Sequence, residues 1–257
     1  MPEKIFLIDT TRCTACRGCQ VACKQWNKLP GTKTHNWGSH QNPADLSFDT
    51  FKLVRFSEVV SEGRLSWYFF SDQCRHCVDP PCKEAADAYV SGAVVVDEGT
   101  GAVIFTEKTR ELYESAFEDV RETCPYDIPR RDPVTGLVSK CTMCIDRVQN
   151  GLVPACVKAC PTGAMNFGGR DEIMALAGKR LGLLKKKGCD KSRLLDDGVR
   201  VVYLVADDPV LYHRFAAAPN HVGITRNLAL RKLFRPASGL IAGMADRGGI
   251  ERSGMVD

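Results

Sequence analysis

Short runs of β-branched and aromatic residues, bounded by turn-forming residues, predict several strands along the chain. The segment KIFLID begins near the N-terminus, and VRVVYLVA lies far along the sequence. A hairpin is predicted where two β-branched runs flank Asp97–Gly101, whose glycines permit tight-turn dihedrals. The predicted strands cover 4–9, 51–56, 67–71, the hairpin 92–105 and 199–206.

Segments with helical character lie between these strands. They cover 19–26, 108–122, 170–187, 209–217 and, as the best candidate in the C-terminal tail, 225–234. The segment 151–168 is predicted to run as a helix, a proline stop and a short strand. A polar loop rich in Gly, Pro, Asn and His is expected over 30–50, and no structure is assigned to 236–257.

With 257 residues the chain is long enough for one or two domains that each have a core. No apolar run approaches the length that spans a bilayer, and the first residues lack the pattern of a signal peptide. The net charge is +4, but from Lys179 onward 15 Lys and Arg oppose 8 Asp and Glu. This tail is interpreted as a solvated surface or as a segment that docks on an acidic partner, and no pattern typical of nucleic-acid binding accompanies it.

The chain has thirteen cysteines, and disulfide bonds are a weak explanation for them, because a chain of this length does not need disulfides to fold. Twelve of them fall into tight groups, and Cys189 is left over. Thiols two residues apart suit a metal site on which several sulfur atoms converge. The groups are 13/16/19/23, 74/77/82, 124, 141/144 and 156/160.

The spacing of the first group follows the C-x2-C-x2-C-x3-C pattern of bacterial ferredoxins. Three thiols of such a loop wrap three corners of a [4Fe–4S] cluster, and the fourth thiol points away and ligates a neighbouring cluster. Exchange of these donors predicts two complete sites. Site 1 consists of Cys13, Cys16, Cys19 and Cys160, and site 2 consists of Cys141, Cys144, Cys156 and Cys23.

The middle of the chain repeats this pattern with one site missing. The loop CRHCVDPPC and the distant Cys124-Pro125 predict site 3, which consists of Cys74, Cys77, Cys82 and Cys124. A donor thiol is expected four residues after Cys82, but that position is Ala86. The three thiols expected before Cys124 are replaced by Glu114, Phe117 and Val120, so the loop and the donor of one cluster are absent together.

We therefore predict three [4Fe–4S] clusters held by twelve thiolates, and no catalytic residue on this chain. Each oxidised cluster with its thiolates carries roughly −2, so nearby basic residues can balance charge and tune potentials. The candidates are Arg12, Arg17, Arg75 and Lys140. The alternative is a zinc-stabilised binding protein, against which the triple run 13/16/19 and the two Cys-Pro donors count.

With these motifs in place, the chain resembles the iron–sulfur subunits of molybdopterin oxidoreductases over roughly residues 3–170. Within that group it is most similar to the small (beta) subunits of periplasmic formate dehydrogenases from sulfate-reducing bacteria. The matching segments are DTTRCTACRGCQVACKQW, HQNP, KLVRF, DQCRHCVDPPCK, CPYDIPR, KCTMCIDRVQNGLVPACVKACPTGAMNFG and LYH at 211–213.

The resemblance implies an α+β fold with two ferredoxin-like units, one nested in the other, and a C-terminal extension. The first unit would comprise 1–30 and 135–170 with two clusters, and the inserted unit 66–133 with one. Residues 31–65 would connect them, and 171–257 would dock a partner.

The resemblance also implies a role in electron transfer. Electrons would come from a large catalytic subunit that holds a tungsten or molybdenum bis-pterin cofactor and its own [4Fe–4S] cluster. They would leave to a periplasmic multihaem cytochrome c, and the chain would be exported with its partner. Subunits that serve nitrate, thiosulfate or polysulfide enzymes are the alternative within the group.

Overall fold

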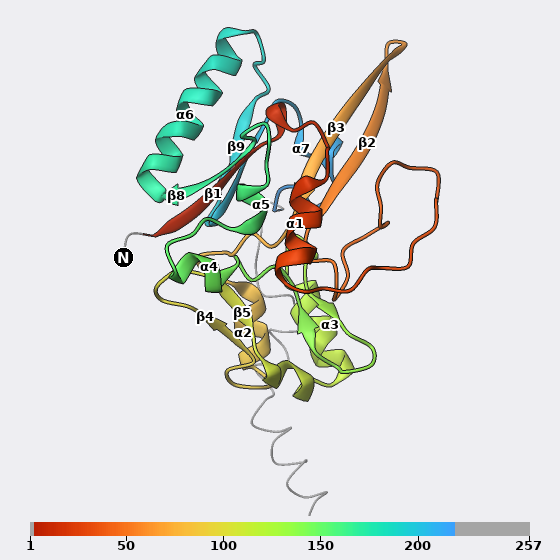
Figure 1. Ribbon diagram of the computed structural model, residues 1–257, viewed down its shortest axis with the longest axis vertical. Helices are drawn as coiled ribbons and strands as arrows, with labels where there is room; N and C mark the ends of the chain where they lie inside the picture. Colours follow the sequence, from red (N-terminus) through yellow and green to blue (C-terminus); the bar gives the residue numbers. More distant parts are fainter. Residues whose placement is uncertain (1–2, 219–257) are drawn as a thin grey trace, which may run out of the picture. The chain divides into compact units, whose positions relative to one another are not determined.

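The computed structural model describes residues 3–218, and its central element is a four-stranded sheet (Figure 1). The strand order is β8-β1-β10-β9, in which β1 pairs with β8 in antiparallel and with β10 in parallel orientation. The sheet therefore joins the start of the chain to segments that follow residue 164. Its strands are β1 (Lys4–Asp9), β8 (Met165–Gly169), β9 (Arg193–Leu195) and β10 (Val201–Val205).

The two faces of this sheet have different neighbours, because successive side chains of a strand point to opposite sides. Ile5 and Leu7 pack with Ile173 and Ala177 of helix α6 (Arg170–Lys186), which covers one face (Figure 1). Phe6 and Ile8 face the opposite way. There they pack in one core with residues of the cysteine loops, namely Ala15, Cys19, Met143 and Cys156.

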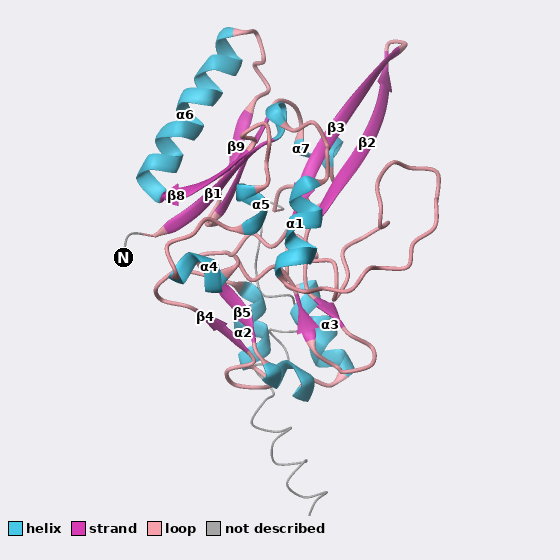
Figure 2. Ribbon diagram, viewed as in Figure 1, coloured by secondary structure: helices cyan, strands magenta, loops and turns pink. Residues whose placement is uncertain are grey.

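A long hairpin of β2 (Leu53–Ser61) and β3 (Arg64–Asp72) projects from this core (Figure 2). Its turn is formed by Glu62 and Gly63, whose φ values of 51° and 73° match the twist of a two-residue hairpin loop. The base of the hairpin is buried, whereas its far half exposes Val60 and Leu65. The base thus belongs to the core that surrounds the cysteine loops.

The remaining elements are short, and most of them lie between the cysteine groups along the chain. At the N-terminus, η1 (Thr10–Arg12) and α1 (Gly18–Trp26) flank the first loop. The others are α2 (Pro81–Asp87), β4 (Val94–Val96), β5 (Val103–Phe105), η2 (Glu107–Glu111), α3 (Glu114–Glu122), β6 (Arg130–Arg131), β7 (Val138–Ser139), α4 (Ile145–Gln149), α5 (Ala155–Lys158) and α7 (Pro209–Tyr212).

The helix predicted over 108–122 is wrong as a continuous element, because the chain is extended at Leu112 and Tyr113 between η2 and α3. The extended backbone buries the Leu112 side chain, and the Leu112 carbonyl accepts a hydrogen bond from Arg131. The Thr109 hydroxyl donates to the Thr106 carbonyl and accepts from the Val138 amide. These tertiary contacts outweigh the local helical preference.

Two C-terminal expectations also change. The helix predicted over 209–217 ends at Tyr212, because His213 is extended. Strand β9 was not expected, and it pairs with β10 inside the main sheet, so part of the range assigned to a docking extension belongs to the core. The candidate helix 225–234 and the end 236–257 lie outside the described residues. No helix within residues 3–218 has the length and apolarity to span a bilayer.

Candidate metal centres

The three C-x-x-C loops share one local geometry. In each loop the residue before the second cysteine has a left-handed backbone: φ is 53° at Ala15, 47° at His76 and 62° at Met143. The amide of that residue donates to the sulfur of the first cysteine, at N···S distances of 3.5, 3.3 and 3.4 Å for Cys13, Cys74 and Cys141. Three non-glycine residues in this costly conformation indicate that a shared requirement shapes the loops.

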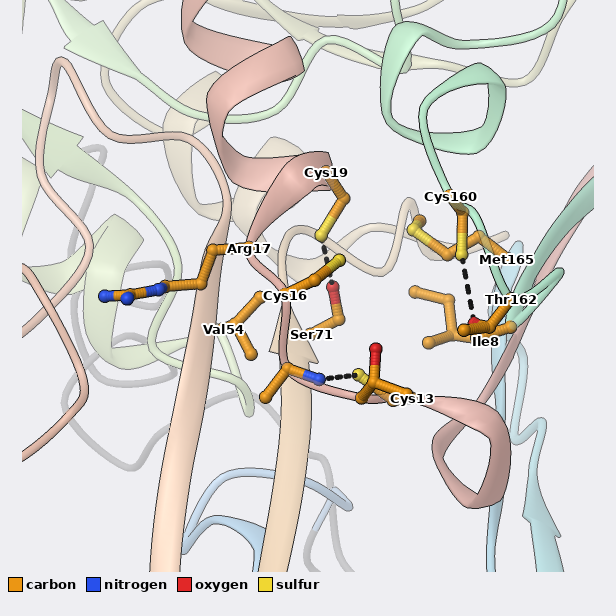
Figure 3. Close-up of a pocket in the computed structure, with 13 residues that line it drawn as sticks. Ile8, Cys13, Cys16, Arg17, Cys19, Val54, Ser71, Cys160, Thr162 and Met165 are labelled. Carbon is orange, nitrogen blue, oxygen red and sulfur yellow. Dashed lines mark hydrogen bonds between the residues drawn. The ribbon is translucent and has the colours of Figure 1, made fainter.

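Site 1 has its four thiols around one small cavity. Figure 3 shows the sulfur atoms of Cys13, Cys16, Cys19 and Cys160 around a common space, whereas Arg17 points away from it. The Sγ of Cys19 lies 3.4 Å from the Ser71 hydroxyl. Ile8, Val54 and Met165 line the apolar walls, so the four-stranded sheet and the β2–β3 hairpin both contribute to this site.

Cys160 differs electrostatically from the other thiols of site 1. Burial raises its pKa, but the amides of Met165, Thr162 and Ala164 and the Thr162 hydroxyl outweigh this and lower the pKa. For Cys13, burial and then the neighbouring thiols Cys19 and Cys160 raise the pKa, against the effect of the Ala15 amide. Hydrogen bonds to a thiolate favour the charged form that binds metal.

Site 2 joins the N-terminal helix to the segment 141–156. Burial raises the pKa of Cys23 well above its ordinary value, and the next contributions come from Cys141, Cys156 and Cys144. Burial and neighbouring thiols likewise raise the pKa of Cys141 to about 12 and that of Cys156 to about 11. These mutual effects indicate that the four thiols predicted for site 2 are neighbours. Helices α1 and α5, which carry Cys23 and Cys156, pack beside one another.

Site 3 has its thiols around a second small cavity. Cys74, Cys77, Cys82 and Cys124 all line it. Burial, followed by repulsion from Cys74 and Cys124, raises the pKa of Cys77 to about 12. Cys124 enters from the C-terminal end of α3, although it lies far from the other three along the chain.

The three sites form a series with site 2 in the middle. Cys156 of site 2 interacts with Cys19 of site 1, and Cys141 of site 2 interacts with Cys74 of site 3. Cys74 and Cys141 also belong to one apolar cluster. Cys189 does not line the cavities of sites 1 and 3, but it lines a surface groove together with Cys13 of site 1.

The positions of the missing fourth site are filled by apolar side chains. Ala86, Phe117 and Val120 are buried, and helices α2 and α3 pack on one another there. Glu114 lies at the start of α3 with its side chain largely exposed. These side chains form a small apolar core at the positions that correspond to the cysteines of a second cluster in the paired sites.

The predicted basic residues separate into two classes. Arg12 and Arg17 are exposed, and the Arg17 guanidinium donates to the His40 carbonyl at the surface. Arg75 and Lys140 are buried. Arg75 lies among the rings of Phe70, Tyr126 and Tyr203 at 5.1, 4.8 and 4.4 Å, and Lys140 donates to the carbonyls of Val103 and Cys141.

A further buried cation, Lys52, was missed from the sequence. Its side chain is fully buried, and its ammonium group donates to the Gln73 side-chain oxygen at 2.5 Å. The signal was a lysine inside the apolar run FKLVRF, at a strand start where side chains are expected inside the protein.

The donor sets fit iron–sulfur clusters better than single ions. Within residues 3–218, no three or more His, Cys, Asp or Glu side chains are grouped so that they could hold one metal ion. All thirteen thiols are free. In the described part of the chain, Nη2 of Arg75 has no hydrogen-bond partner although it is buried, and Arg75 lines the cavity of site 3. A negatively charged cluster in that cavity would satisfy both the thiols and this cation.

Comparisons with known proteins agree with this chemistry. Residues 65–170 match the family model of the 4Fe-4S dicluster domain. The beta subunit of formate dehydrogenase from Megalodesulfovibrio gigas is 53% identical over 216 residues, which are 84% of this chain and 100% of that protein. The chain belongs to the iron–sulfur (beta) subunits of formate dehydrogenases.

Other members of this family support the assignment. The beta subunit of formate dehydrogenase 2 (cytochrome c-553) from Nitratidesulfovibrio vulgaris is 53% identical over 215 residues, covering 83% of this chain and 98% of that subunit. The formate dehydrogenase-O iron-sulfur subunit of Escherichia coli is 41% identical over 223 residues, or 84% and 72% of the two chains. As a member of this family with a dicluster domain, the chain is an electron-transfer subunit that holds [4Fe–4S] clusters.

Proposed function

We propose that this chain relays electrons from the catalytic subunit of a formate dehydrogenase to a cytochrome c through three [4Fe–4S] clusters. One observation supports the proposal most directly: the four thiols of site 1 line one cavity and the four thiols of site 3 line another, each set drawn from distant segments. The thiols assigned to site 2 influence one another and also Cys19 of site 1 and Cys74 of site 3. A [4Fe–4S] cluster accepts and releases one electron at a time, so three in series provide stepwise transfer.

The ligand sets of the proposal are those of sites 1, 2 and 3. Cys13, Cys16, Cys19 and Cys160 hold cluster 1; Cys23, Cys141, Cys144 and Cys156 hold cluster 2; Cys74, Cys77, Cys82 and Cys124 hold cluster 3. In this assignment the segments 1–30 and 135–170 form a two-cluster unit into which the one-cluster unit 66–133 is inserted. The common backbone geometry of the three C-x-x-C loops supports the repeat.

The spatial series suggests the direction of transfer. Sites 1 and 3 form the two ends, and the exposed Cys16 brings site 1 close to the surface. We place the catalytic subunit at site 1 and the exit to the cytochrome at site 3, whose pair partner has been replaced by packing. Electrons would then cross site 2 in every turnover.

The chain's own residues set the conditions for this transfer. The loops bury most of the thiols and donate amide hydrogen bonds to the first sulfur of each C-x-x-C pair. Buried Arg75 and Lys140 supply positive charge beside site 3. Burial, hydrogen bonds to sulfur and neighbouring charge are the factors by which a protein tunes cluster potentials.

The partners follow from the family. The proposed catalytic subunit holds a tungsten or molybdenum bis-pterin cofactor and its own [4Fe–4S] cluster, and the complex is a heterodimer in the periplasm. The relative from Nitratidesulfovibrio vulgaris has cytochrome c-553 in its name, which supports a cytochrome c as acceptor. Identity of 53% to two formate dehydrogenase subunits favours formate over nitrate, thiosulfate or polysulfide as the substrate of the complex.

Purification of the chain under anoxic conditions with its bound partner tests the proposal. We expect about 12 irons per copy of this chain beyond those of the partner, because three sites hold four each. We also expect tungsten or molybdenum in the partner and formate-dependent reduction of viologen. A zinc-containing, colourless chain would contradict the cluster assignment, and a partner active on another substrate would contradict the formate assignment.

A further inference from the structure

Arg75 is a buried cation whose two terminal amino groups have different surroundings. Its side chain is 2% exposed. The Nη1 group donates to the Asp72 carboxylate at 3.2 Å, to the Tyr203 hydroxyl at 3.1 Å and to the Gln73 carbonyl. Within the described part of the chain, the Nη2 group is buried and has no hydrogen-bond partner. A buried donor without an acceptor is costly, so an acceptor is expected beside Nη2.

The cavity of site 3 is the place where this acceptor can lie. Arg75 lines that cavity together with the four thiols of the site. Tyr126 lines it as well, and the Arg75 guanidinium lies 4.8 Å from the centre of the Tyr126 ring. The guanidinium group is planar and rigid, so the three acceptors that hold Nη1 also fix the position of Nη2. The free donor is thus held in place at the wall of a cavity that four thiols share.

The cavity of site 1 differs in the groups that accompany its thiols. The cation among its lining residues is Arg17, which is exposed and points away from the thiols (Figure 3). Neutral hydroxyl groups lie beside the sulfur atoms instead, with Ser71 at 3.4 Å from Cys19 and Thr162 at 3.7 Å from Cys160. A buried guanidinium with a free donor therefore distinguishes the cavity of site 3 from that of site 1.

We propose that Nη2 of Arg75 donates a hydrogen bond to a sulfur atom of cluster 3 and thereby raises the reduction potential of that cluster. The inference rests on the proposed ligand set of site 3. Each added electron makes a cluster more negative, so a charged donor stabilises the reduced cluster more than the oxidised one. Asp72 does not neutralise Arg75 alone, because the same carboxylate pairs with Arg55 at 2.8 Å. A raised potential at site 3 suits the proposed exit of electrons there.

A redox titration of the purified complex, followed by electron paramagnetic resonance, tests the effect on potential. In Arg75→Met the equilibrium for reduction of cluster 3 should weaken at least tenfold, which is a shift of about 59 mV to lower potential for a one-electron couple. Arg75→Lys keeps the positive charge but lacks the second amino group, so its shift should be smaller but measurable. Cluster 1 should keep its potential in both variants.

Pulsed electron paramagnetic resonance tests the hydrogen bond itself. The complex is prepared with arginine that carries nitrogen-15 in its guanidinium group, and cluster 3 is reduced. We expect a coupling between this nitrogen and the electron spin of cluster 3 in the unmodified protein. The coupling should be absent from Arg75→Lys and Arg75→Met, whereas a purely structural role of Arg75 would give no such coupling.

Two control variants separate the hydrogen bond from charge and from packing. Lys140 lines the same cavity, but its ammonium group donates to the carbonyls of Val103 at 2.5 Å and Cys141 at 3.0 Å. Lys140→Met should therefore lower the potential of cluster 3 through loss of charge and leave the nitrogen coupling intact. Arg55→Met removes the other cation that pairs with Asp72, and because Arg55 does not line the cavity, the coupling should again remain.

The outcomes separate this inference from the proposed function. Iron counts and three cluster signals in the unmodified protein test the ligand sets independently of Arg75. Absence of the nitrogen coupling, or an unchanged potential of cluster 3 in an iron-replete Arg75→Met variant, would overturn the inference. Equal potentials in Arg75→Lys and the unmodified protein would assign Arg75 a charge effect alone and overturn the hydrogen bond. If Arg75→Met does not retain cluster 3, the coupling decides: its loss in Arg75→Lys supports the inference, and its persistence there overturns it.

Discussion

The paired sites and the lone site start from the same loop but are completed differently. In the proposed ligand sets, sites 1 and 2 exchange donors, since Cys160 completes the N-terminal loop and Cys23 completes the later one. Site 3 receives Cys124, which lies two residues after helix α3, and gives no donor in return, because Ala86 occupies that position. Where the second cluster of this unit would lie, Phe117 and Val120 are packed instead.

In the proposed assignment, a cluster and an apolar core occupy equivalent places in similar frameworks. In the paired region, the thiols of each proposed site come from segments far apart along the chain, so cluster binding would be coupled to folding there. In the lone region, burial of apolar side chains between α2 and α3 supplies part of the stability. Mutations in the two regions should therefore have different effects on cluster binding and on stability.

The largest effect should come from removal of one ligand in each region. In Cys82→Ala we expect about 8 irons per chain, since four are lost with cluster 3. Formate should still reduce clusters 1 and 2, but cytochrome reduction should be lost. In Cys23→Ala cluster 2 is lost, so formate should reduce cluster 1 alone. Iron analysis, electron paramagnetic resonance and a cytochrome assay measure these differences.

Cys189→Ala is the matched control, because Cys189 lies outside the three sites. It should retain about 12 irons and the full rate of cytochrome reduction. Normal cytochrome reduction by Cys82→Ala would show that electrons leave before site 3. Site 3 would then not be the exit to the cytochrome. If Cys23→Ala retained all its iron, Cys23 would not be a cluster ligand, and the donor exchange on which the comparison depends would be wrong.

A smaller effect should follow when a cavity is created in the small apolar core between α2 and α3. Phe117 is 7% exposed, and the Arg131 guanidinium lies 5.7 Å from its ring centre. Phe117→Ala should lower the free energy of unfolding by about 3–5 kcal/mol, because a large buried side chain is removed and a cavity remains. The iron content of the folded protein should not change. Urea unfolding monitored by circular dichroism, with parallel iron analysis, measures both quantities.

Val134→Ala serves as the control for Phe117→Ala, because Val134 is 90% exposed and its truncation should leave stability unchanged. If Phe117→Ala were as stable as the unmodified protein but released iron from site 3, the packed helices would act as part of the cluster site. In that case the lone region would not have an independent core.

The grouping of the thiols is predicted from the sequence, because ligand spacing is a local property. C-x-x-C loops and Cys-Pro donors limit which thiols can share a centre, and in the structure the thiols predicted for site 1 line one cavity and those predicted for site 3 line another. That part of the hypothesis needed no knowledge of tertiary contacts. The replaced positions Ala86, Phe117 and Val120 were also found by spacing alone.

Features that depend on distant contacts were not predictable. Strand β9 exists because β10 offers it an edge, and the break at Leu112 exists because Arg131 and Val138 bond the chain there. Lys52 was overlooked because its burial beside Gln73 is a tertiary contact. The series of the three sites likewise follows from contacts such as Cys141 with Cys74, which no spacing specifies.

The smallest effect concerns an ion-pair network that joins the connecting segment to the inserted segment of the lone site. Asp45, in the connecting segment, pairs with Arg55 at 2.6 Å and with Arg130 of the inserted segment at 2.9 Å. Burial raises the pKa of Asp45, but the hydrogen bond and charge of Arg55 and the charge of Arg130 outweigh it and lower the pKa. Because the folded pKa lies below the unfolded value, the ionised carboxylate stabilises the protein above about pH 4, and this contribution is lost as the pH falls further.

Asp45→Asn should therefore lower stability at pH 7 by at most about 1 kcal/mol, since the side chain is half exposed and solvent screens it. The difference from the unmodified protein should shrink as the pH is lowered from 7 towards 3, and unfolding midpoints measured across this range test it. Comparison at each pH cancels any acid loss of clusters that both proteins share. Glu107→Gln removes a more exposed ion pair within the inserted segment and should change the midpoints less. If the difference in unfolding midpoint were the same at all pH values, Asp45 would act through packing. Its charge would then contribute nothing to the link between the connecting and inserted segments.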